Sequence, residues 1–296
     1  MRFHTGTLIH LVPVARWLVA NSPLLWMRQR AWDFGHWRRH DFVIRVRNVR
    51  ITGNSTDLIQ RYIYWFGVWE PDLTHFVLQR MGSNPTRTFV DVGANIGYFS
   101  LLVAKSHPRS RVVSVEASPP TLAKLQHHIR LNEIANIRVV PQAASDYEGS
   151  IDLFLSEPNN EGATTTIAGL HASAAVSVPC APLSSLLTVE EIKSARLIKI
   201  DVEGAEASVL KGLESCLALL PQDVEVVVEI SARSQRESEA VFALMERHHF
   251  HAYGLANSYL PQAYLQRHQP AAPCRLECRP VLQTDVIFSR VDAPSL

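Results

Sequence analysis

The sequence predicts an α/β fold built on a doubly wound, mostly parallel sheet of the Rossmann-like type, with a mainly helical N-terminal extension. Two observations predict it. From residue 88 to residue 249, short β-favouring segments alternate with segments of helical spacing, which is typical of a parallel sheet covered by helices on both faces. The first of these strands runs into a glycine-lined turn and a helix, as nucleotide-binding folds begin. We therefore expect a ligand site at the carboxyl ends of the strands.

The first 85 residues are expected to form the extension, and residues 86–296 the domain that holds the sheet. The apolar stretch near the start is interrupted by polar side chains, which favours amphipathic helices over a membrane span. The expected elements of the extension are one or two helices within 8–27, strands at 42–46 and 49–52, a helix from residue 57, and a second helix that Pro71 begins.

The alternating region supplies five strands and four helices. They are strands at 88–92, 111–116, 137–141, 197–201 and 224–230, and helices at 97–105, 119–132, 205–216 and 235–249. The tail segments 252–255 and 281–289 are expected to pair as an antiparallel edge hairpin, which makes a seven-stranded sheet. Residues 150–182 are expected to form a short strand at 151–155 and then a long irregular connection outside the sheet, called the excursion below. A connection this long is expected to be functional and to cover the acceptor side of a pocket.

The first strand leads into Asp91-Val-Gly-Ala-Asn-Ile-Gly97, whose glycines are spaced differently from the G-x-G-x-x-G pattern of dinucleotide sites. This spacing leaves the acid Asp91 at the carboxyl end of the strand. A carboxylate there suits a ligand with an ammonium or sulfonium group, such as S-adenosylmethionine, and would repel a diphosphate. We expect Asp91, Gly93, Asn95 and Gly97 to bind that cofactor. The alternative is a tight turn that needs glycine only for steric reasons.

Two segments, FVDVGANIGYFS and LIKIDVEGAE, resemble the FkbM-type S-adenosylmethionine-dependent methyltransferases. The resemblance implies a class I methyltransferase fold with seven core strands and S-adenosylmethionine as methyl donor. It also implies O-methylation of a sugar hydroxyl on a glycoconjugate or of a polyketide-type alcohol. The alternatives are a nicotinamide-dependent oxidoreductase, which the glycine spacing and Asp91 disfavour, and a non-catalytic scaffold that keeps the fold.

Further acids and small residues extend the predicted cofactor site. Glu116 ends the second strand, where a carboxylate accepts hydrogen bonds from ribose hydroxyls in related folds. Ser145 and Asp146 follow the third strand, and Asp146 is expected to accept from the adenine amine unless it is a turn residue. Glu70 matches a position where the family carries an acid, on a helix expected to cover the pocket.

Asp201 and Glu203 crowd the end of the fourth strand with Glu206, and such a cluster is costly unless a cation or a proton lies among its members. Helix capping explains Glu206, whereas Asp201 and Glu203 are expected to be catalytic. Asp201 is the first candidate for the base that deprotonates the acceptor, or for a ligand of the donor's ammonium group. The expected acceptor-binding residues are Asn160, on the excursion, and Glu229, on the fifth strand. The alternative for Asn160 is a plain loop residue, and the alternative for Glu229 is a hydrogen-bonded buried glutamate.

Composition excludes several other classes of function. The chain has 296 residues, 19% charged residues and a formal charge of +1, which shows no nucleic-acid-binding footprint. Arginines and aromatic residues alternate between residues 28 and 50; a solvated face is preferred there over membrane contact. Four cysteines are too few for a disulfide scaffold, and no metal site is expected. The expectation is a cytoplasmic enzyme with a small-molecule or glycan acceptor.

Overall fold

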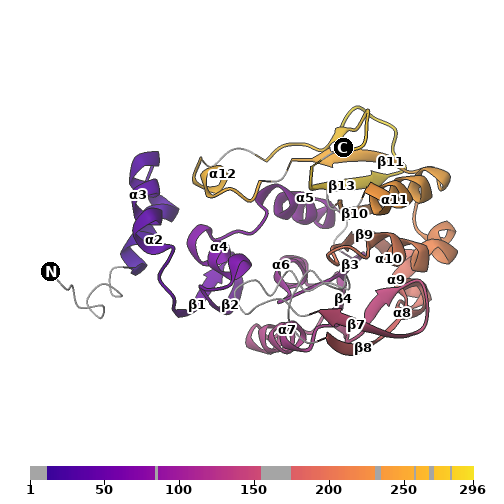
Figure 1. Cartoon of the computed structure of the whole chain (residues 1–296), viewed down its shortest axis with the longest axis horizontal. Helices are drawn as coiled ribbons and strands as arrows, with labels where there is room; N and C mark the ends of the chain where they lie inside the picture. The colour runs from indigo at the N-terminus through magenta and orange to yellow at the C-terminus, as the bar shows by residue number, and fades with distance from the viewer. Residues whose placement is uncertain are drawn as a thin grey trace.

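The computed structural model describes residues 12–83, 86–154, 175–230, 235–256, 258–266, 270–280 and 282–296. Its centre is a sheet in the order β12-β11-β13-β10-β9-β3-β4-β5 (Figure 1). The strands are β3 (Thr88–Val92), β4 (Arg111–Val115), β5 (Ile137–Val140), β9 (Ala195–Ile200), β10 (Glu225–Ile230), β11 (His251–Leu255), β12 (Cys274–Arg275) and β13 (Thr284–Ser289).

The sheet confirms the mostly parallel Rossmann-like prediction and corrects its tail. Strands β5, β4, β3, β9 and β10 run parallel, and β13 is antiparallel to both β10 and β11. The predicted pairing of the tail segments is therefore present, but β13 is inserted between β10 and β11 and is not at the edge. The sheet has eight strands in the described chain because the short β12 pairs with β11 beyond the predicted seven.

Alternate residues of each strand pack on opposite faces of the sheet, as strand geometry requires. On one face, Phe89, Leu197 and Val227 pack with α4 (Leu58–Phe66), α5 (Pro71–Gly82) and α6 (Tyr98–Ser106). On the other face, Val90, Ile198 and Val226 pack with α10 (Glu206–Leu213) and α11 (Gln235–Arg247). The sheet is thus covered on both sides, and its carboxyl edge remains available for a ligand.

A second sheet of three strands lies beside the first. It consists of β6 (Ala143–Ser145), β8 (Ala175–Pro182) and β7 (Gly149–Phe154), in the order β6-β8-β7. Strands β7 and β8 are antiparallel, so the predicted irregular excursion is wrong for residues 175–182, which are a strand. Residues 155–174, the centre of the excursion, lie outside the described residues. The helix α7 (Pro119–Leu131) follows β4, and α8 (Leu183–Leu186), α9 (Val189–Ser194) and the 3₁₀ helix η2 (Glu214–Leu219) complete this side.

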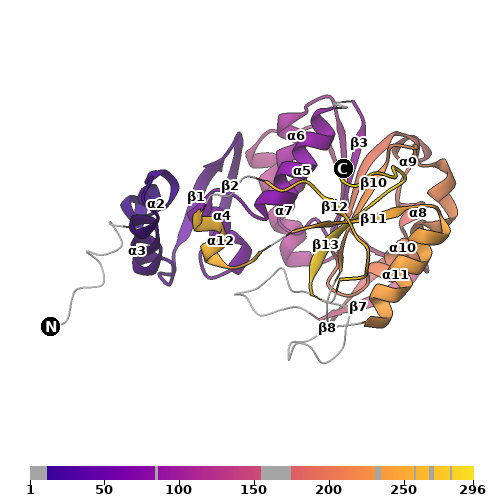
Figure 2. The same ribbon diagram turned by 90° about the horizontal axis from the view of Figure 1, so that it is seen from above.

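The N-terminal part contains α2 (Val12–Asn21), α3 (Leu25–Gly35) and a hairpin of β1 (Asp41–Val46) and β2 (Val49–Asn54). The predicted strands and a helix within 8–27 are therefore present, whereas α3 continues to Gly35, beyond the predicted range; the boundary near residue 85 stays a prediction. Buried side chains of α2 and α3 join the same hydrophobic cluster as Phe89 and Leu197. Figure 2 shows these helices at one end of the molecule, beside β1, α4 and α12 (Pro261–Gln266). None of the helices in the described ranges reaches the length and apolarity that a membrane span requires.

Candidate active site

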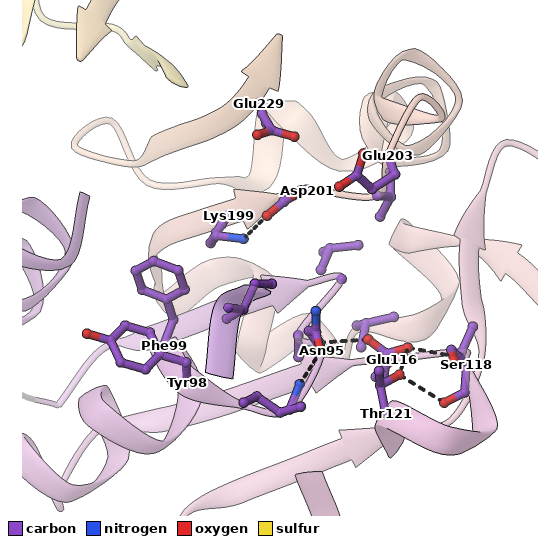
Figure 3. A pocket seen from close by; sticks show the side chains of 18 of the residues that line it. Asn95, Tyr98, Phe99, Glu116, Ser118, Thr121, Lys199, Asp201, Glu203 and Glu229 are labelled. Carbon is purple, nitrogen blue, oxygen red and sulfur yellow. Dashed lines mark hydrogen bonds and ion pairs between the residues drawn. The ribbon is translucent and has the colours of Figure 1, made fainter. Parts of the chain in front are cut away.

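A cavity of about 290 Å³ opens at the carboxyl ends of β3, β4, β9 and β10 (Figure 3). This is the edge where ligands bind in open parallel sheets. Seven of the residues predicted for the site line it: Glu70, Gly93, Asn95, Glu116, Asp201, Glu203 and Glu229. The folding of β3, β4, β9 and β10 into one sheet thus brings together acids that are far apart in the sequence.

The turn after β3 depends on glycine for a structural reason. Gly93 has a φ of +77°, and a Cβ atom added there would lie 1.8 Å from the backbone oxygen of Asp201. The ends of β3 and β9 therefore approach each other more closely than any side chain allows. Gly97, at φ +89°, is the N-cap residue of α6 and lies outside the cavity lining. The steric role thus accounts for both glycines, and Gly93 in addition faces the cavity.

Glu116 is held in place by the protein itself. One carboxylate oxygen accepts hydrogen bonds from the Ser118 backbone N–H and the Thr121 hydroxyl, both at 2.8 Å, and the other accepts from the Asn95 N–H at 2.7 Å. Burial raises the pKa of Glu116, and these hydrogen bonds oppose the rise. A carboxylate has about four acceptor positions, so three are occupied and one remains for a ligand hydroxyl.

Asp91 lies behind the cavity wall and not in it. Its carboxylate accepts from the backbone N–H and the hydroxyl of Ser100, at 3.1 and 2.6 Å. The second oxygen has no hydrogen-bond partner among the described residues. Burial raises the pKa of Asp91, whereas the nearby Lys199 ammonium lowers it. The described structure therefore does not bring Asp91 into contact with the cavity, because its side chain turns towards the first turn of α6.

Lys199 is a functional candidate that the sequence analysis missed. It lies on β9, is buried, and donates from Nζ to Asp201 Oδ2 at 2.8 Å (Figure 3). The ammonium also lies 5.1 Å from the centre of the Phe99 ring, within the range of a cation–π contact. Burial would lower the pKa of Lys199, but Asp201, Asp91 and Glu70 together raise it. Lys199 is therefore a permanent cation beneath the acids of the cavity.

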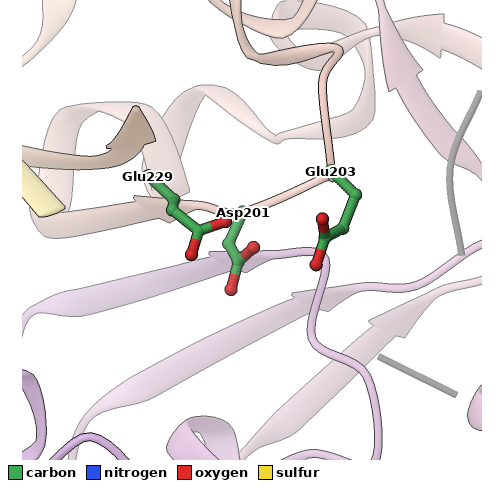
Figure 4. A group of neighbouring side chains, drawn as sticks. All are labelled: Asp201, Glu203 and Glu229. Atoms are coloured by element: carbon green, nitrogen blue, oxygen red, sulfur yellow. The ribbon is translucent and has the colours of Figure 1, made fainter. Parts of the chain in front are cut away.

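Three acids converge at the ends of β9 and β10. Asp201, Glu203 and Glu229 each place a carboxylate oxygen within 4.8 Å of the others (Figure 4). Glu206 does not join them. Its carboxylate accepts from the backbone N–H groups of Val202 and Gly204 and closes the turn before α10, in agreement with the predicted structural role. Carboxylates this close favour a proton or a cation among them; the expectation that no metal binds here stays a prediction.

A phenol links one of these acids, Glu229, to a further acid, Glu70. The Tyr259 hydroxyl lies 2.8 Å from Glu70 Oε1 and 3.0 Å from Glu229 Oε1. A phenol has one proton to donate, so the second contact is a hydrogen bond only when one of the two carboxyl groups is protonated and donates to the phenol oxygen. Burial and the negative charges around them hold the pKa of both Glu70 and Glu229 well above the usual range. The raised pKa values favour a protonated carboxyl group in this arrangement at the cavity wall.

Other predicted residues lie outside this cavity. Asp146 accepts from the Ser208 hydroxyl and pairs with the Lys211 ammonium at 2.6 Å, and the Ser145 hydroxyl lies 3.3 Å from that of Ser208. Ala143 and Ala144, just before them, line the cavity instead. The cause is the pairing of β6 with β8, which directs Ser145 and Asp146 towards α10. Asn160 lies outside the described residues.

The chain shares its two signature segments with a known family. A family model described as the methyltransferase FkbM domain matches residues 91–254, more than half of the chain. The chain belongs to the FkbM methyltransferase family. It is 28% identical over 144 residues to Methyltransferase 1 of Beauveria bassiana, and this match covers 42% of the chain and 57% of that protein. It is 26% identical over 166 residues to Methyltransferase sdnD of Sordaria araneosa, covering 46% and 63%. The chain thus spans about six-tenths of the length of these relatives.

Among solved structures, the methyltransferase FkbM of Methylobacillus flagellatus matches 96% of the chain and 60% of its own length, with 13% identity and a TM-score of 0.38. The precorrin-6y C5,15-methyltransferase of Geobacter metallireducens matches 76% and 90%, with 10% identity and a TM-score of 0.44. Members of the FkbM methyltransferase family use S-adenosylmethionine as methyl donor, and the described residues fit it. Gly93 and Asn95 of the turn line the cavity, and Glu116 retains one acceptor position beside that turn.

Proposed function

We propose that this FkbM methyltransferase transfers a methyl group from S-adenosylmethionine to a hydroxyl oxygen of a small-molecule acceptor. The acceptor is a sugar of a glycoconjugate or a polyketide-type alcohol. The observation that carries the proposal is the joining of the glycine turn and the acids of β9 and β10 in one cavity. The donor has a sulfonium and an ammonium group, and an acid-rich wall favours both.

The cofactor would lie along the ends of β3 and β4. Gly93 and Asn95 lie at the turn, and Glu116 accepts one ribose hydroxyl through its remaining acceptor position. The other three acceptor positions of this carboxylate are taken by protein donors. The adenine would lie against Ala143 and Ala144, whose small side chains leave the space for a flat ring. Asp146 does not contribute to this arrangement.

The acceptor hydroxyl must lose its proton as its oxygen attacks the methyl carbon. The bound donor supplies the electrophilic methyl group, and Asp201 takes the proton, with Glu203 as the neighbour that can replace it. Lys199 fixes the orientation of the Asp201 carboxylate through its 2.8 Å contact. Glu229, and Asn160 as expected from the sequence, bind the acceptor. Holding the three reacting atoms in line supplies the rest of the rate enhancement.

A nicotinamide-dependent oxidoreductase remains the second candidate, but the acids oppose it. A dinucleotide brings a diphosphate to this edge of the sheet, where Glu70, Asp201, Glu203 and Glu229 would repel it. The same repulsion disfavours a nucleic-acid acceptor, whose phosphates would have to approach the same wall. A small neutral acceptor is therefore the better fit.

A binding experiment tests the cofactor assignment. Isothermal titration should show micromolar-range binding of S-adenosylmethionine or its demethylated product and no binding of NAD. The Glu116→Ala substitution should weaken it by roughly 1–3 kcal/mol, because polar ribose groups lose their acceptor. Glu148→Ala, at an exposed position outside the cavity, is the matched control and should bind normally. Binding of NAD without binding of the sulfonium compound would refute the assignment.

A turnover experiment tests the base. Asp201→Asn keeps the side-chain shape and removes the basicity, so kcat should fall by roughly 10²–10⁴-fold with little change in melting temperature. If Asp201 only holds the ammonium group of the donor, the loss will appear as weaker cofactor binding. Activity should not change with EDTA. An Asp201→Asn enzyme that binds cofactor and turns over normally would transfer the role to Glu203 or Glu229.

A further inference from the structure

Four consecutive apolar residues are exposed at the turn between α2 and α3. They are Pro23, Leu24, Leu25 and Trp26, and the last three are 47%, 48% and 58% exposed. Trp17, on the last half of α2, is 61% exposed as well. Runs of three or more exposed apolar residues are unusual on a soluble surface unless they have a function. The turn therefore forms an apolar tip at the end of the molecule shown on the left of Figures 1 and 2.

Folding does not explain this tip. Leu24 is the N-cap residue of α3 and its side chain offers no capping hydrogen bond, although Ser, Thr, Asp or Asn would stabilise the helix there. The hairpin is held from its other side. Buried Arg28 donates to the backbone oxygens of Val19 and Tyr264, and Trp32 packs in the core. The exposed residues could be polar without loss of these contacts.

Arginines on α3 and directly after it lack acidic partners. Arg30 lies 5.9 Å from the ring centre of Trp26, and Arg38 lies 4.7 Å from that of the exposed Trp37. Within the described ranges, Arg30, Arg38 and Arg39 have no carboxylate within ion-pair distance, whereas many arginines of the sheet domain do. Their guanidinium groups are thus available to an external anion.

The charge of the whole chain is divided in the same way. Residues 1–54 contain nine arginines, no lysine, and the two acids Asp33 and Asp41, which gives a formal charge of +7. Because the chain as a whole has a charge of +1, the remaining residues carry −6. An anionic surface therefore attracts this end and repels the rest, which fixes the orientation of approach.

We propose that the α2–α3 hairpin docks on the surface of an anionic lipid bilayer. Leucine and tryptophan side chains of an interfacial segment enter the boundary between headgroups and acyl chains, and tryptophan prefers that depth. Arg30, beside Trp26, and the arginines that follow α3 contact the lipid phosphates. A second copy of the chain is the less suitable occupant, since pairing two hairpins of this charge would bring their arginines together. The hairpin lies on the membrane and does not cross it.

Co-sedimentation of the full chain with vesicles tests the proposal. The protein should bind vesicles of phosphatidylcholine and phosphatidylglycerol, bind phosphatidylcholine alone much more weakly, and dissociate as salt is added. The double variant Leu25→Glu/Trp26→Glu should bind at least about tenfold more weakly, because two apolar side chains are replaced by anions. Removing charge in Arg30→Gln/Arg39→Gln should weaken binding by about fivefold for each arginine.

Matched controls lie outside the hairpin, in the part of the chain that forms the central sheet and its helices. Leu219→Glu, at a leucine that is also 48% exposed, and Arg109→Gln/Arg236→Gln should bind vesicles nearly as the wild type does. All these positions are exposed, so melting temperatures should not change. Wild-type protein that stays unbound at low salt would overturn the proposal, as would normal vesicle binding by Leu25→Glu/Trp26→Glu. If light scattering shows that the wild type is a dimer, that Leu25→Glu/Trp26→Glu is a monomer, and neither binds vesicles, the tip contacts a second copy instead.

Discussion

Lys199 is the residue on which the acids of the cavity depend. Removing one partner of a buried ion pair leaves the other charges uncompensated, which typically costs 3–5 kcal/mol. Lys199→Met should therefore lower the free energy of unfolding by about 3–5 kcal/mol in urea titrations at neutral pH. The loss should shrink in acid, where Asp91 and Glu70, whose pKa values are raised by burial, become neutral.

Lys211 is the matched control for this prediction. It also pairs with an aspartate, Asp146, at 2.6 Å, but its side chain is largely exposed to water. An exposed pair contributes little to stability, so Lys211→Met should leave the unfolding transition nearly unchanged. Equal effects of the two substitutions would show that the Lys199 charge is not needed to balance the cavity.

Glu206 should make stability depend on pH. Burial raises its pKa from 4.5 to about 6 in the folded protein. Because the folded pKa lies above the unfolded one, this contribution is present below pH 4.5 and is lost as pH rises through about 6. From pH 4.5 to pH 7, wild type should lose about 2 kcal/mol relative to Glu206→Gln. Urea unfolding of both proteins across this range measures the difference, and a constant difference would contradict the prediction.

Individual site residues differ in how far the sequence predicts them. Glu116 and Asp201 directly follow core strands, so their positions follow from the strand pattern. The sequence also contains a signal for Lys199. A lysine within an apolar strand needs a partner for its charge, and a residue two positions before Asp201 lies on the same face of the strand as Asp201. Tyr259 comes from the tail and has no such signal, because only the folded chain brings it to Glu70 and Glu229.

At the scale of elements, the close approach of β3 and β9 depends on Gly93. Gly93→Ala and Gly67→Ala both place a side chain at positive φ, which costs about 1–2 kcal/mol. Gly67 has open space around it, whereas the new atom at Gly93 meets the Asp201 backbone. Thermal or urea unfolding should therefore show that Gly93→Ala costs roughly 1–3 kcal/mol more than Gly67→Ala. Equal costs would mean that the two strand ends separate easily.

The elements themselves were largely predictable, because hydrophobic periodicity fixes which segments form strands and helices. The order of the C-terminal strands within the sheet was not predictable. The insertion of β13 between β10 and β11 is decided by long-range pairing, and the two-residue β12 is too short to leave a pattern. Similarly, β8 lies at the end of residues 150–182, where the polar residues that precede it give no strand pattern. Its regular structure depends on pairing with β6 and β7.

At the scale of the whole molecule, one helix connects the two surfaces on which the proposals rest. Arg16 of α2 donates to the backbone oxygen of Tyr64 in α4, and Leu58 and Ile59 of the same α4 line the cavity. Docking through α2 and α3 would thus hold the cavity at a fixed orientation to the bilayer. Sequence alone does not distinguish an apolar residue that packs inside from one that is exposed, so the tip could only be recognised in the folded chain.

A proton held by Glu70 or Glu229, whose pKa values are raised beside Tyr259, should also affect the heat of cofactor binding. A cation that enters the cavity stabilises the ionised carboxylates and lowers their pKa, so binding expels part of that proton into the buffer. Calorimetric enthalpies should then vary with the ionisation enthalpy of the buffer, and the apparent affinity should increase as pH rises. Once the methyl group has left, the sulfur is neutral and the proton returns. If the chain transfers methyl groups as proposed, the cavity should exchange protons with solvent in each catalytic cycle, separately from the proton taken from the acceptor.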